Sequence, residues 1–372
     1  MKMCTLCPRN CAVDRAGGER GICGQTEQLK VARAALHYWE EPCISGESGS
    51  GAVFFSGCAL HCVFCQNRSI ANGTAGKEIT KERLAEIFLE LQEKGANNIN
   101  LVTPGHFAPQ ITEALCRAKK EGLRLPVVYN TSSYESADTI KSLEGLVDIY
   151  LPDFKYISPA LSAKYSHASD YADVAKAAVA EMVRQCPRPV FDGDEAEDPI
   201  EEGLLMRQGV IVRHLLLPGC TRDSKAVIKY LYETYGNQIY LSIMNQYTPL
   251  ENVSAYPELN RKVTDEEYEE VVPDIQAVSE DEYLLDGGIL IDDLNEELGL
   301  KLETENYDTL SGYLIEKLGH IPEKDDRDTI LSDNLVFTVE EVRDNRITKA
   351  RLKIEPASES EEEEHSGKKD TI

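Results

Sequence analysis

Three cysteines lie close together in the sequence, Cys58, Cys62 and Cys65, in a Cys-x3-Cys-x2-Cys pattern. They come directly after residues 52–56, a short apolar run with the composition of a strand. Three thiolates on one loop can hold three irons of a [4Fe–4S] cluster and leave the fourth iron open to a substrate or cofactor. A structural zinc normally needs four protein ligands, and this loop adds only His61 between two of its cysteines. The pattern therefore favours an iron–sulfur cluster over a zinc knuckle or three plain thiols.

A second group of cysteines stands near the start of the sequence, with the spacing Cys-x2-Cys-x3-Cys-x11-Cys. Four cysteines in so short a segment can build a zinc site or a second iron–sulfur cluster, and a set of reduced thiols is the alternative. The members of this group are Cys4, Cys7, Cys11 and Cys23.

The rest of the composition limits where the protein works. The sequence begins without an apolar signal segment and has no run of about 18 apolar residues, so we expect a cytoplasmic chain without a transmembrane helix. A reducing cytosol disfavours disulfides, which directs clustered cysteines towards metal or redox chemistry. The 372 residues include 65 acidic and 39 basic ones, a formal charge of −26. Nucleic acids and anionic membranes need a positive surface, so we expect no nucleic-acid partner.

Short β-rich runs alternate with helical patterns through the middle of the chain. In residues 81–94, for example, Leu84, Phe88 and Leu91 recur on one helix face. Such alternation predicts βαβ units and an α/β fold with a parallel sheet. Six units fit a partial (βα)6 TIM-like barrel, with ligands at the carboxyl ends of the strands. Strands are expected at 52–56, 98–103, 126–131, 147–154, 210–217 and 238–245, and helices at 81–94, 109–121, 136–143, 174–184 and 224–235.

The expected organisation changes after residue 272, because no cysteine follows Cys220 and the βα pattern ends. A strand is expected at 282–292, helices at 293–298 and 308–318, and a hairpin from 335–342 and 346–354. The four expected parts are a Cys-rich N-terminal segment at 1–50, the partial barrel at 51–272, a small α+β domain at 273–355 and a disordered acidic tail at 356–372.

The Cys58–Cys65 stretch resembles the signature of the radical S-adenosylmethionine (SAM) superfamily. That resemblance implies a [4Fe–4S] cluster whose open iron is chelated by SAM, with Phe64 near the adenine and Asn67 in the SAM pocket. It also implies that an electron from the cluster cleaves SAM into methionine and a 5′-deoxyadenosyl radical, which then abstracts a hydrogen atom.

Further motifs resemble the activating enzymes of glycyl-radical enzymes, such as pyruvate formate-lyase activating enzyme. The fourth expected strand ends in Asp153-Phe-Lys155, which is similar to an Asp-x-Lys element that contacts the methionyl part of SAM in that family. Arg213 on the fifth strand matches an arginine that meets the SAM carboxylate, a task suited to a guanidinium fork. Asn130, at the end of the third strand, fits a further SAM contact, while a surface ion pair is the alternative for Asp153 and Lys155.

One segment departs from the activating enzymes. Where that family carries a Gly-Gly-Glu type motif, this chain has Thr103-Pro-Gly-His106, so Thr103 and His106 become candidate SAM ligands. A helix-start role before Pro109 is the alternative for His106. This departure and the N-terminal cysteines resemble a subgroup of proteins similar to pyruvate formate-lyase activating enzyme.

Residues 273–355 resemble a different family, the transporter-associated domain of hemolysin-C-like and magnesium/cobalt-efflux proteins. The resemblance rests on stretches such as Tyr283–Gly288 and Asn334–Val339. That domain is grouped by fold with FAD-binding domains, so FAD enters only by analogy. A natural fusion and a junction made by rearrangement both explain the abrupt change.

Taken together, the resemblances imply a radical SAM oxidoreductase that activates a glycyl-radical enzyme. Its expected partners are that enzyme or a peptide substrate, and a flavodoxin- or ferredoxin-type electron donor. The alternatives are a radical SAM enzyme that modifies a peptide or small molecule, and a non-catalytic fusion whose C-terminal domain is an accessory module.

Overall fold

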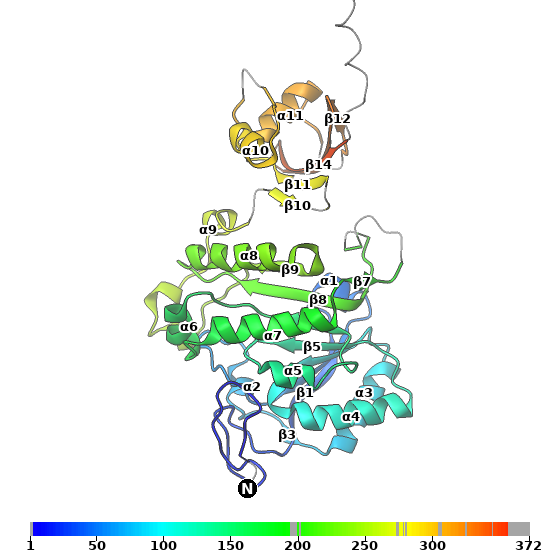
Figure 1. Cartoon of the computed structure of the whole chain (residues 1–372), viewed down its shortest axis with the longest axis vertical. Helices are drawn as coiled ribbons and strands as arrows, with labels where there is room; N and C mark the ends of the chain where they lie inside the picture. Colours follow the sequence, from blue (N-terminus) through cyan, green and yellow to red (C-terminus); the bar gives the residue numbers. More distant parts are fainter. Residues whose placement is uncertain are drawn as a thin grey trace, which may run out of the picture. The chain divides into compact units, whose positions relative to one another are not determined.

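The chain folds as two units, Met1–Val271 and Val272–Ile372, which are described separately. The computed structural model (Figure 1) describes residues 3–193, 199–200, 202–272, 275–277, 279, 281–303, 307–323, 326–343 and 345–355. The expected tail at 356–372 lies outside these residues.

The first unit is built on a nine-stranded mixed sheet, with the strand order β3-β1-β2-β4-β5-β6-β8-β7 and with β9 paired to β8. Six strands, β2, β4, β5, β6, β8 and β9, run parallel to their neighbours in this order. They correspond to the six strands expected from the sequence, so the α/β class is confirmed. The strands are β1 Lys30–His37, β2 Ser50–Phe55, β3 Lys77–Glu78, β4 Ile99–Val102, β5 Val127–Thr131, β6 Ile149–Pro152, β7 Val190–Phe191, β8 Met206–Leu215 and β9 Tyr240–Met244.

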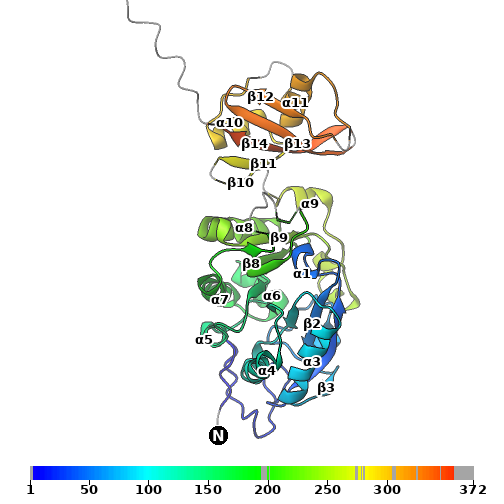
Figure 2. The ribbon, with the colours of Figure 1, turned by 90° about the vertical axis from the view of Figure 1, so that its right-hand side faces the viewer.

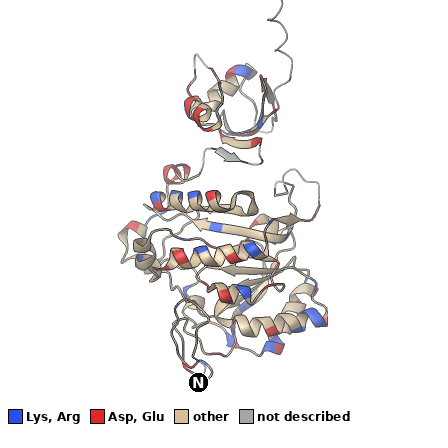
Figure 3. Cartoon of the chain, viewed as in Figure 1, with Lys and Arg blue, Asp and Glu red and all other residues tan. Residues whose placement is uncertain are grey.

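The helices between these strands carry an apolar face towards the sheet and a charged face outwards. Helix α3 begins where the Thr80 side chain accepts a hydrogen bond from the Arg83 N–H, and it buries Leu84, Phe88 and Leu91. Lysines, arginines and acidic residues are spread along the helices of this unit (Figure 3). Helices α5, α7 and α8 lie in front of the strands in the view of Figure 1. The helices are α1 Pro42–Ser45, α2 Arg68–Ala71, α3 Lys81–Glu93, α4 Ala108–Glu121, α5 Ala137–Lys141, α6 Pro159–Ser166, α7 Tyr171–Gln185, α8 Thr221–Tyr235 and α9 Asp265–Glu269, with single 3-10 turns η1 Gly105–Phe107, η2 Gly236–Gln238, η3 Glu251–Val253 and η4 Pro257–Leu259.

The two faces of the sheet have different neighbours. Val127, Tyr129 and Tyr150 belong to the large core that includes the long helices. The alternate residues Val128 and Leu151 belong to a smaller core that contains the short helix α1. Because side chains alternate along a strand, Asn130 and Asp153 share the α1 face with Val128 and Leu151.

Strand β1 was not expected from the sequence, because it falls inside the segment 1–50 that shows little periodicity. It pairs antiparallel with β2 and with β3. Of its eight residues only Val31 is fully buried, which explains the weak alternation.

The second unit is a five-stranded antiparallel sheet in the order β10-β11-β14-β13-β12, packed against two helices (Figure 2). Phe337 and Tyr313 meet in its core, with ring centroids 6.2 Å apart. The strand expected at 282–292 is shorter than predicted: it ends at Asp286, because Gly287 turns the chain so closely that a side chain there would strike the Ile347 carbonyl. The elements are β10 Ile275–Ala277, β11 Glu282–Asp286, α10 Ile291–Leu298, α11 Leu310–Leu318, β12 Thr329–Ser332, β13 Leu335–Arg343 and β14 Arg346–Ile354.

Candidate active site

The three-cysteine loop connects strand β2 to helix α2, as expected. Cys58, Cys62 and Cys65 are partly buried free thiols. The Leu60 N–H donates to the Cys58 sulfur over 3.5 Å. Burial raises the pKa of Cys65, and the backbone N–H of Asn67 opposes that rise. Backbone donors directed at cysteine sulfurs are a common feature of iron–sulfur sites, where they tune the cluster.

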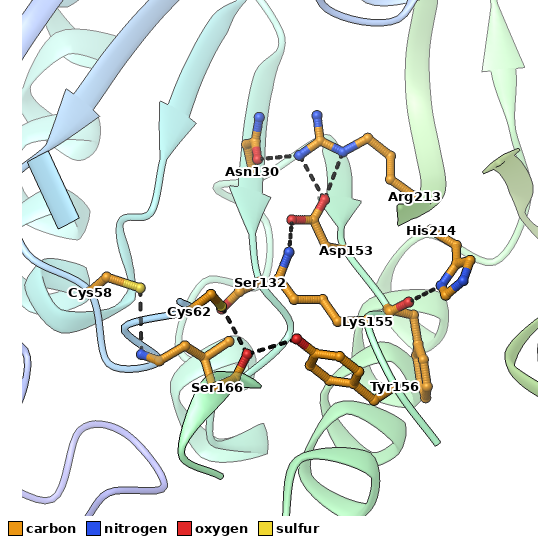
Figure 4. A network of polar contacts seen from close by, with 12 residues as sticks. Cys58, Cys62, Asn130, Ser132, Asp153, Lys155, Tyr156, Ser166, Arg213 and His214 are labelled. Carbon is orange, nitrogen blue, oxygen red and sulfur yellow. Dashed lines mark hydrogen bonds and ion pairs between the residues drawn. The ribbon is translucent and has the colours of Figure 1, made fainter. Parts of the chain in front are cut away.

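Cys62 is held by a chain of hydroxyl groups that the sequence did not reveal (Figure 4). Ser166, the last residue of α6, donates to the Cys62 sulfur over 3.0 Å, and its oxygen lies 3.0 Å from the Tyr156 hydroxyl. Burial raises the pKa of the Cys62 thiol to about 12, although the Lys155 charge opposes this. A metal that binds here must therefore displace a proton from the thiol.

The donor set fits a [4Fe–4S] cluster. A cavity of about 330 Å³ adjoins the loop and is lined by Cys62, Cys65, Arg68 and six further residues. A single tetrahedral zinc would require all of its ligand atoms to lie within about 4.8 Å of one another. Within the described residues, the sulfurs of the three cysteines do not meet this limit. The one group of three ligand atoms that meets this limit there is His320, Asp326 and Asp328, on the surface of the second unit.

Four predicted SAM contacts converge next to this loop. Asp153 follows the end of β6, and it accepts from Arg213 on β8 over 2.9 Å and from Lys155 over 2.8 Å. Arg213 also donates to the Asn130 side-chain oxygen over 2.8 Å (Figure 4). The side chains of Asp153, Lys155 and Arg213 are only 15–21 % exposed, so the surface-ion-pair alternative does not describe them.

Opposite charges control protonation in this network. Burial alone would raise the pKa of Asp153, but Arg213 and Lys155 lower it below the usual value. Burial alone would lower the pKa of Lys155, but Asp153 and Cys62 raise it. Asp153, Lys155 and Arg213 therefore all carry charge at neutral pH.

Glu40 completes the network and was missed from the sequence. It precedes α1, and its carboxylate lies 3.1 Å from Arg213 and 3.4 Å from the Asn130 amide nitrogen. Burial raises the pKa of Glu40 to about 7, although Arg213 lowers it. Two consecutive acidic residues, Glu40 and Glu41, stand before Pro42 in the sequence and could have suggested a site. The contact of Glu40 with Arg213 spans 173 positions, and no periodic sequence pattern predicts a contact of that kind.

Phe64 and Asn67 differ in environment. Phe64 is buried, and its ring packs edge-on against Tyr247 at a centroid distance of 6.3 Å. Asn67 is exposed, occupies the N-cap of α2 and makes no side-chain capping bond. Contacts of either residue with SAM stay predictions.

Thr103 and His106 lie in the connection from β4 to α4. Thr103 has φ +57°, a strained conformation for a β-branched residue, and its N–H donates to the Asn130 carbonyl. His106 is buried and its Nε2 donates to the Ser56 carbonyl over 2.7 Å, while burial lowers its pKa to about 4. The ring of His106 thus has a structural partner immediately before α4, and SAM binding by Thr103 or His106 stays a prediction.

The four N-terminal cysteines Cys4, Cys7, Cys11 and Cys23 are brought into one neighbourhood. Burial raises the pKa of Cys7 to about 12 and also raises the pKa of Cys23, and the neighbouring Cys4 adds to the rise at both thiols. In the described part of the chain, no helix has the length and apolar character needed to span a bilayer.

Comparison with known families supports two different domains. Residues 52–190 match the family model of the radical SAM superfamily, and residues 276–356 match that of the transporter associated domain. The radical SAM family implies a [4Fe–4S] cluster and SAM as cofactors. The expected subgroup of activating enzymes, the FAD of the second unit and a metal at the N-terminus have no counterpart in these matches.

Individual relatives match different lengths of the chain. The uncharacterized protein MJ0674 of Methanocaldococcus jannaschii is 27 % identical over 282 residues, which cover 73 % of each chain. The UPF0053 protein YhdP of Bacillus subtilis is 30 % identical over 96 residues, 26 % of this chain and 21 % of the relative. A crystal structure of a hemolysin domain from Enterococcus faecalis is 32 % identical and covers 23 % of this chain and 100 % of that domain, with a TM-score of 0.22.

Proposed function

We propose that this chain is a radical SAM enzyme that activates a glycyl-radical enzyme. The observation that supports this most directly is the convergence of Asn130, Asp153, Lys155 and Arg213 beside Cys62. These side chains come from three parallel strands and share the face opposite the long helices. In this proposal the strands form a partial (βα)6 barrel that encloses the site.

Each residue has a role that its geometry permits. Cys58, Cys62 and Cys65 would ligate three irons, and Nη1 of Arg213 would bind the SAM carboxylate in place of Glu40. Asp153 and Lys155 would position the methionyl part, with Asn130 beside them. When bound, the cluster and SAM supply a 5′-deoxyadenosyl radical and free methionine. Phe64, in its pocket with Tyr247, would stack beside the adenine.

Arg213 now pairs with Asp153, Glu40 and Asn130, and the Glu41 carboxylate lies 3.8 Å from the same Nη1 atom that contacts Glu40. To receive a carboxylate, it must weaken its bond to Glu40, because two carboxylates repel each other at the same guanidinium nitrogen. The raised pKa of Glu40, about 7, allows that group to take up a proton as the SAM carboxylate arrives. Glu40 would thus release Arg213 without leaving a buried unpaired charge.

The hydrogen atom would come from a backbone glycine of a partner enzyme in the cytoplasm. The radical takes the hydrogen and becomes 5′-deoxyadenosine, and the partner keeps the unpaired electron. A flavodoxin- or ferredoxin-type protein would deliver the one electron that SAM cleavage requires. The second unit fits an accessory module, with a closed core of its own.

Electron paramagnetic resonance tests this assignment. The reduced, SAM-loaded protein is mixed with a candidate glycyl-radical enzyme, and the proposal expects a glycyl radical doublet on the partner that is absent with a Cys62→Ala variant. A peptide or small molecule that loses a hydrogen while no glycyl enzyme is activated would point to the alternative radical SAM reaction.

A further inference from the structure

The four N-terminal cysteines are folded around one point. The sulfur atoms of Cys11 and Cys23 lie 3.2 and 3.4 Å from the position that a side-chain carbon on Gly21 would take. Cys4 is fixed on the other side, because its N–H donates to the Val13 carbonyl and its own carbonyl accepts from the Ala12 N–H. A side-chain carbon at position 21 would therefore press against both sulfurs.

The N-terminal cysteines share two features with the Cys58–Cys65 loop. In each set three cysteines fall within eight residues, 4–11 and 58–65. The backbone N–H two residues further on acts on the sulfur in both sets: Arg9 on Cys7 and Gln25 on Cys23, as Leu60 does on Cys58. Backbone N–H groups directed at thiolates stabilise their negative charge when they bind a metal.

A buried arginine supplies positive charge at the same place. The Arg15 guanidinium is 6 % exposed, and its Nη1 lies 3.9 Å from the Cys4 sulfur. The other guanidinium contacts go to the Thr26 and His106 carbonyls, so no carboxylate among its described hydrogen-bond partners neutralises it. Arg15 thus places a buried positive charge beside the Cys4 sulfur, where it would offset the negative charge of a cluster bound by four cysteines.

The segment is also docked onto the three-cysteine loop. Arg9 donates to the Ala59 carbonyl over 2.8 Å and to the Ser166 carbonyl over 3.1 Å. The Ile22 carbonyl, next to Cys23, lies 2.7 Å from the His61 Nε2. Both ends of the N-terminal cysteine group therefore touch the residues that flank Cys58 and Cys62.

We propose that Cys4, Cys7, Cys11 and Cys23 hold a second [4Fe–4S] cluster, with a protein thiolate on every iron. A single zinc draws its four sulfurs to about 3.8 Å from one another, as its Zn–S distance of about 2.3 Å dictates. In the described residues, no three of these four sulfurs all lie within 4.8 Å of one another, and the same holds for the Cys58, Cys62 and Cys65 sulfurs. A fully ligated cluster has no open iron, so it does not bind SAM.

Metal analysis and electron paramagnetic resonance of the full chain, prepared anaerobically, test this inference. Two clusters give about eight irons per chain, and the Cys58→Ala/Cys62→Ala/Cys65→Ala variant keeps about four. The cluster that remains in that variant has a signal that SAM does not alter. The complementary Cys4→Ser/Cys7→Ser/Cys11→Ser/Cys23→Ser variant keeps about four irons, with a signal that SAM does alter.

Single substitutions show whether a loss of iron in the multiple mutants comes from the loss of ligands or from misfolding. Gly21→Ala places a methyl group against two of the sulfurs and is expected to lower iron content by up to half, while Cys116→Ser, at an exposed cysteine outside both sets, leaves it unchanged. The inference is overturned if the triple alanine variant binds no iron, or if one zinc per chain is found that the four serine substitutions remove. Neither result depends on which partner the enzyme activates.

Discussion

Arg213 and Asp153 form a hydrogen-bonded ion pair at 2.9 Å, although they lie 60 positions apart in the sequence. The pair is possible because β6 and β8 are neighbours and because both residues face the side of the sheet that holds α1. Lys155 and Asn130 then attach to the same pair. A cluster that places two cations and a carboxylate together provides complementary charges for both ends of an amino acid.

The ion pair makes Arg213 important for stability as well as for binding. Replacing it with alanine leaves Asp153 and Glu40 buried without their main partner, which is expected to lower the free energy of unfolding by about 3 kcal/mol. Arg207, on the same strand, pairs with Asp192 at the surface, and Arg207→Ala is expected to cost no more than about 1 kcal/mol. Urea denaturation of both variants checks the difference, and equal costs would contradict the central role of the buried pair.

The hydroxyl of Ser166 is expected to tune the cluster on Cys62. Loss of a hydrogen bond to a cluster sulfur lowers the reduction potential, so Ser166→Ala should make the SAM-binding cluster harder to reduce. Ser162 lies one turn earlier on α6 and donates to the Pro159 carbonyl instead, which makes Ser162→Ala the matched control. A redox titration that gives the same potential for Ser166→Ala and wild type would show that this contact has no electronic effect.

His214 predicts a pH dependence of stability. The ring is 1 % exposed, its Nδ1 donates to the Phe154 carbonyl over 2.7 Å, and burial lowers its pKa to about 4. Because the unfolded value is about 6.5, the unfolded state binds the proton first, and stability falls as pH drops from about 6.5 to 4.

Protonation of His214 alone is expected to lower the free energy of unfolding by about 3 kcal/mol between pH 6.5 and pH 4. A His214→Gln variant should show a flatter stability curve over that range, whereas Ser224→Ala, which removes only a hydroxyl partner of the ring, keeps the slope. Denaturation curves at pH 7 and pH 4.5 measure both, and identical slopes for wild type and His214→Gln would refute the prediction.

A substitution that destabilises the second unit is not expected to change SAM cleavage by the first unit. Phe337 is fully buried against Tyr313, so Phe337→Ala should lower the stability of this unit by about 3 to 5 kcal/mol and leave SAM cleavage unchanged. The control is Leu331→Ala, at a side chain on β12 that is 73 % exposed, and it is expected to change neither the stability of this unit nor SAM cleavage. Calorimetry together with a SAM cleavage assay checks both, and a loss of cleavage in Phe337→Ala would mean that the unit supports catalysis.

Much of the site could be predicted from local sequence. The three-cysteine loop could be predicted because its ligands fall within eight residues, and Asp153 and Lys155 could be predicted because their Asp-x-Lys spacing stands at the end of an apolar run. The six parallel strands were predicted because each is a compact apolar run. Strand β1 was not, since only Val31 is fully buried in it.

What the sequence missed depends on contacts between distant segments. Ser166 reaches Cys62 across 104 positions, and Glu40 reaches Arg213 across 173. Neither residue belongs to a periodic pattern or a spaced motif. Such pairings depend on where α1 begins and where α6 ends relative to the sheet, and these positions are set by tertiary packing.

The most direct test is formation of 5′-deoxyadenosine. The protein is reconstituted anaerobically with iron and sulfide, then given SAM and a strong reductant. The account predicts 5′-deoxyadenosine and methionine in equal amounts, lost in Cys62→Ala and kept in Cys116→Ala. Full iron loading without product, or product from Cys62→Ala at the wild-type rate, would contradict a SAM-cleaving cluster on Cys58, Cys62 and Cys65.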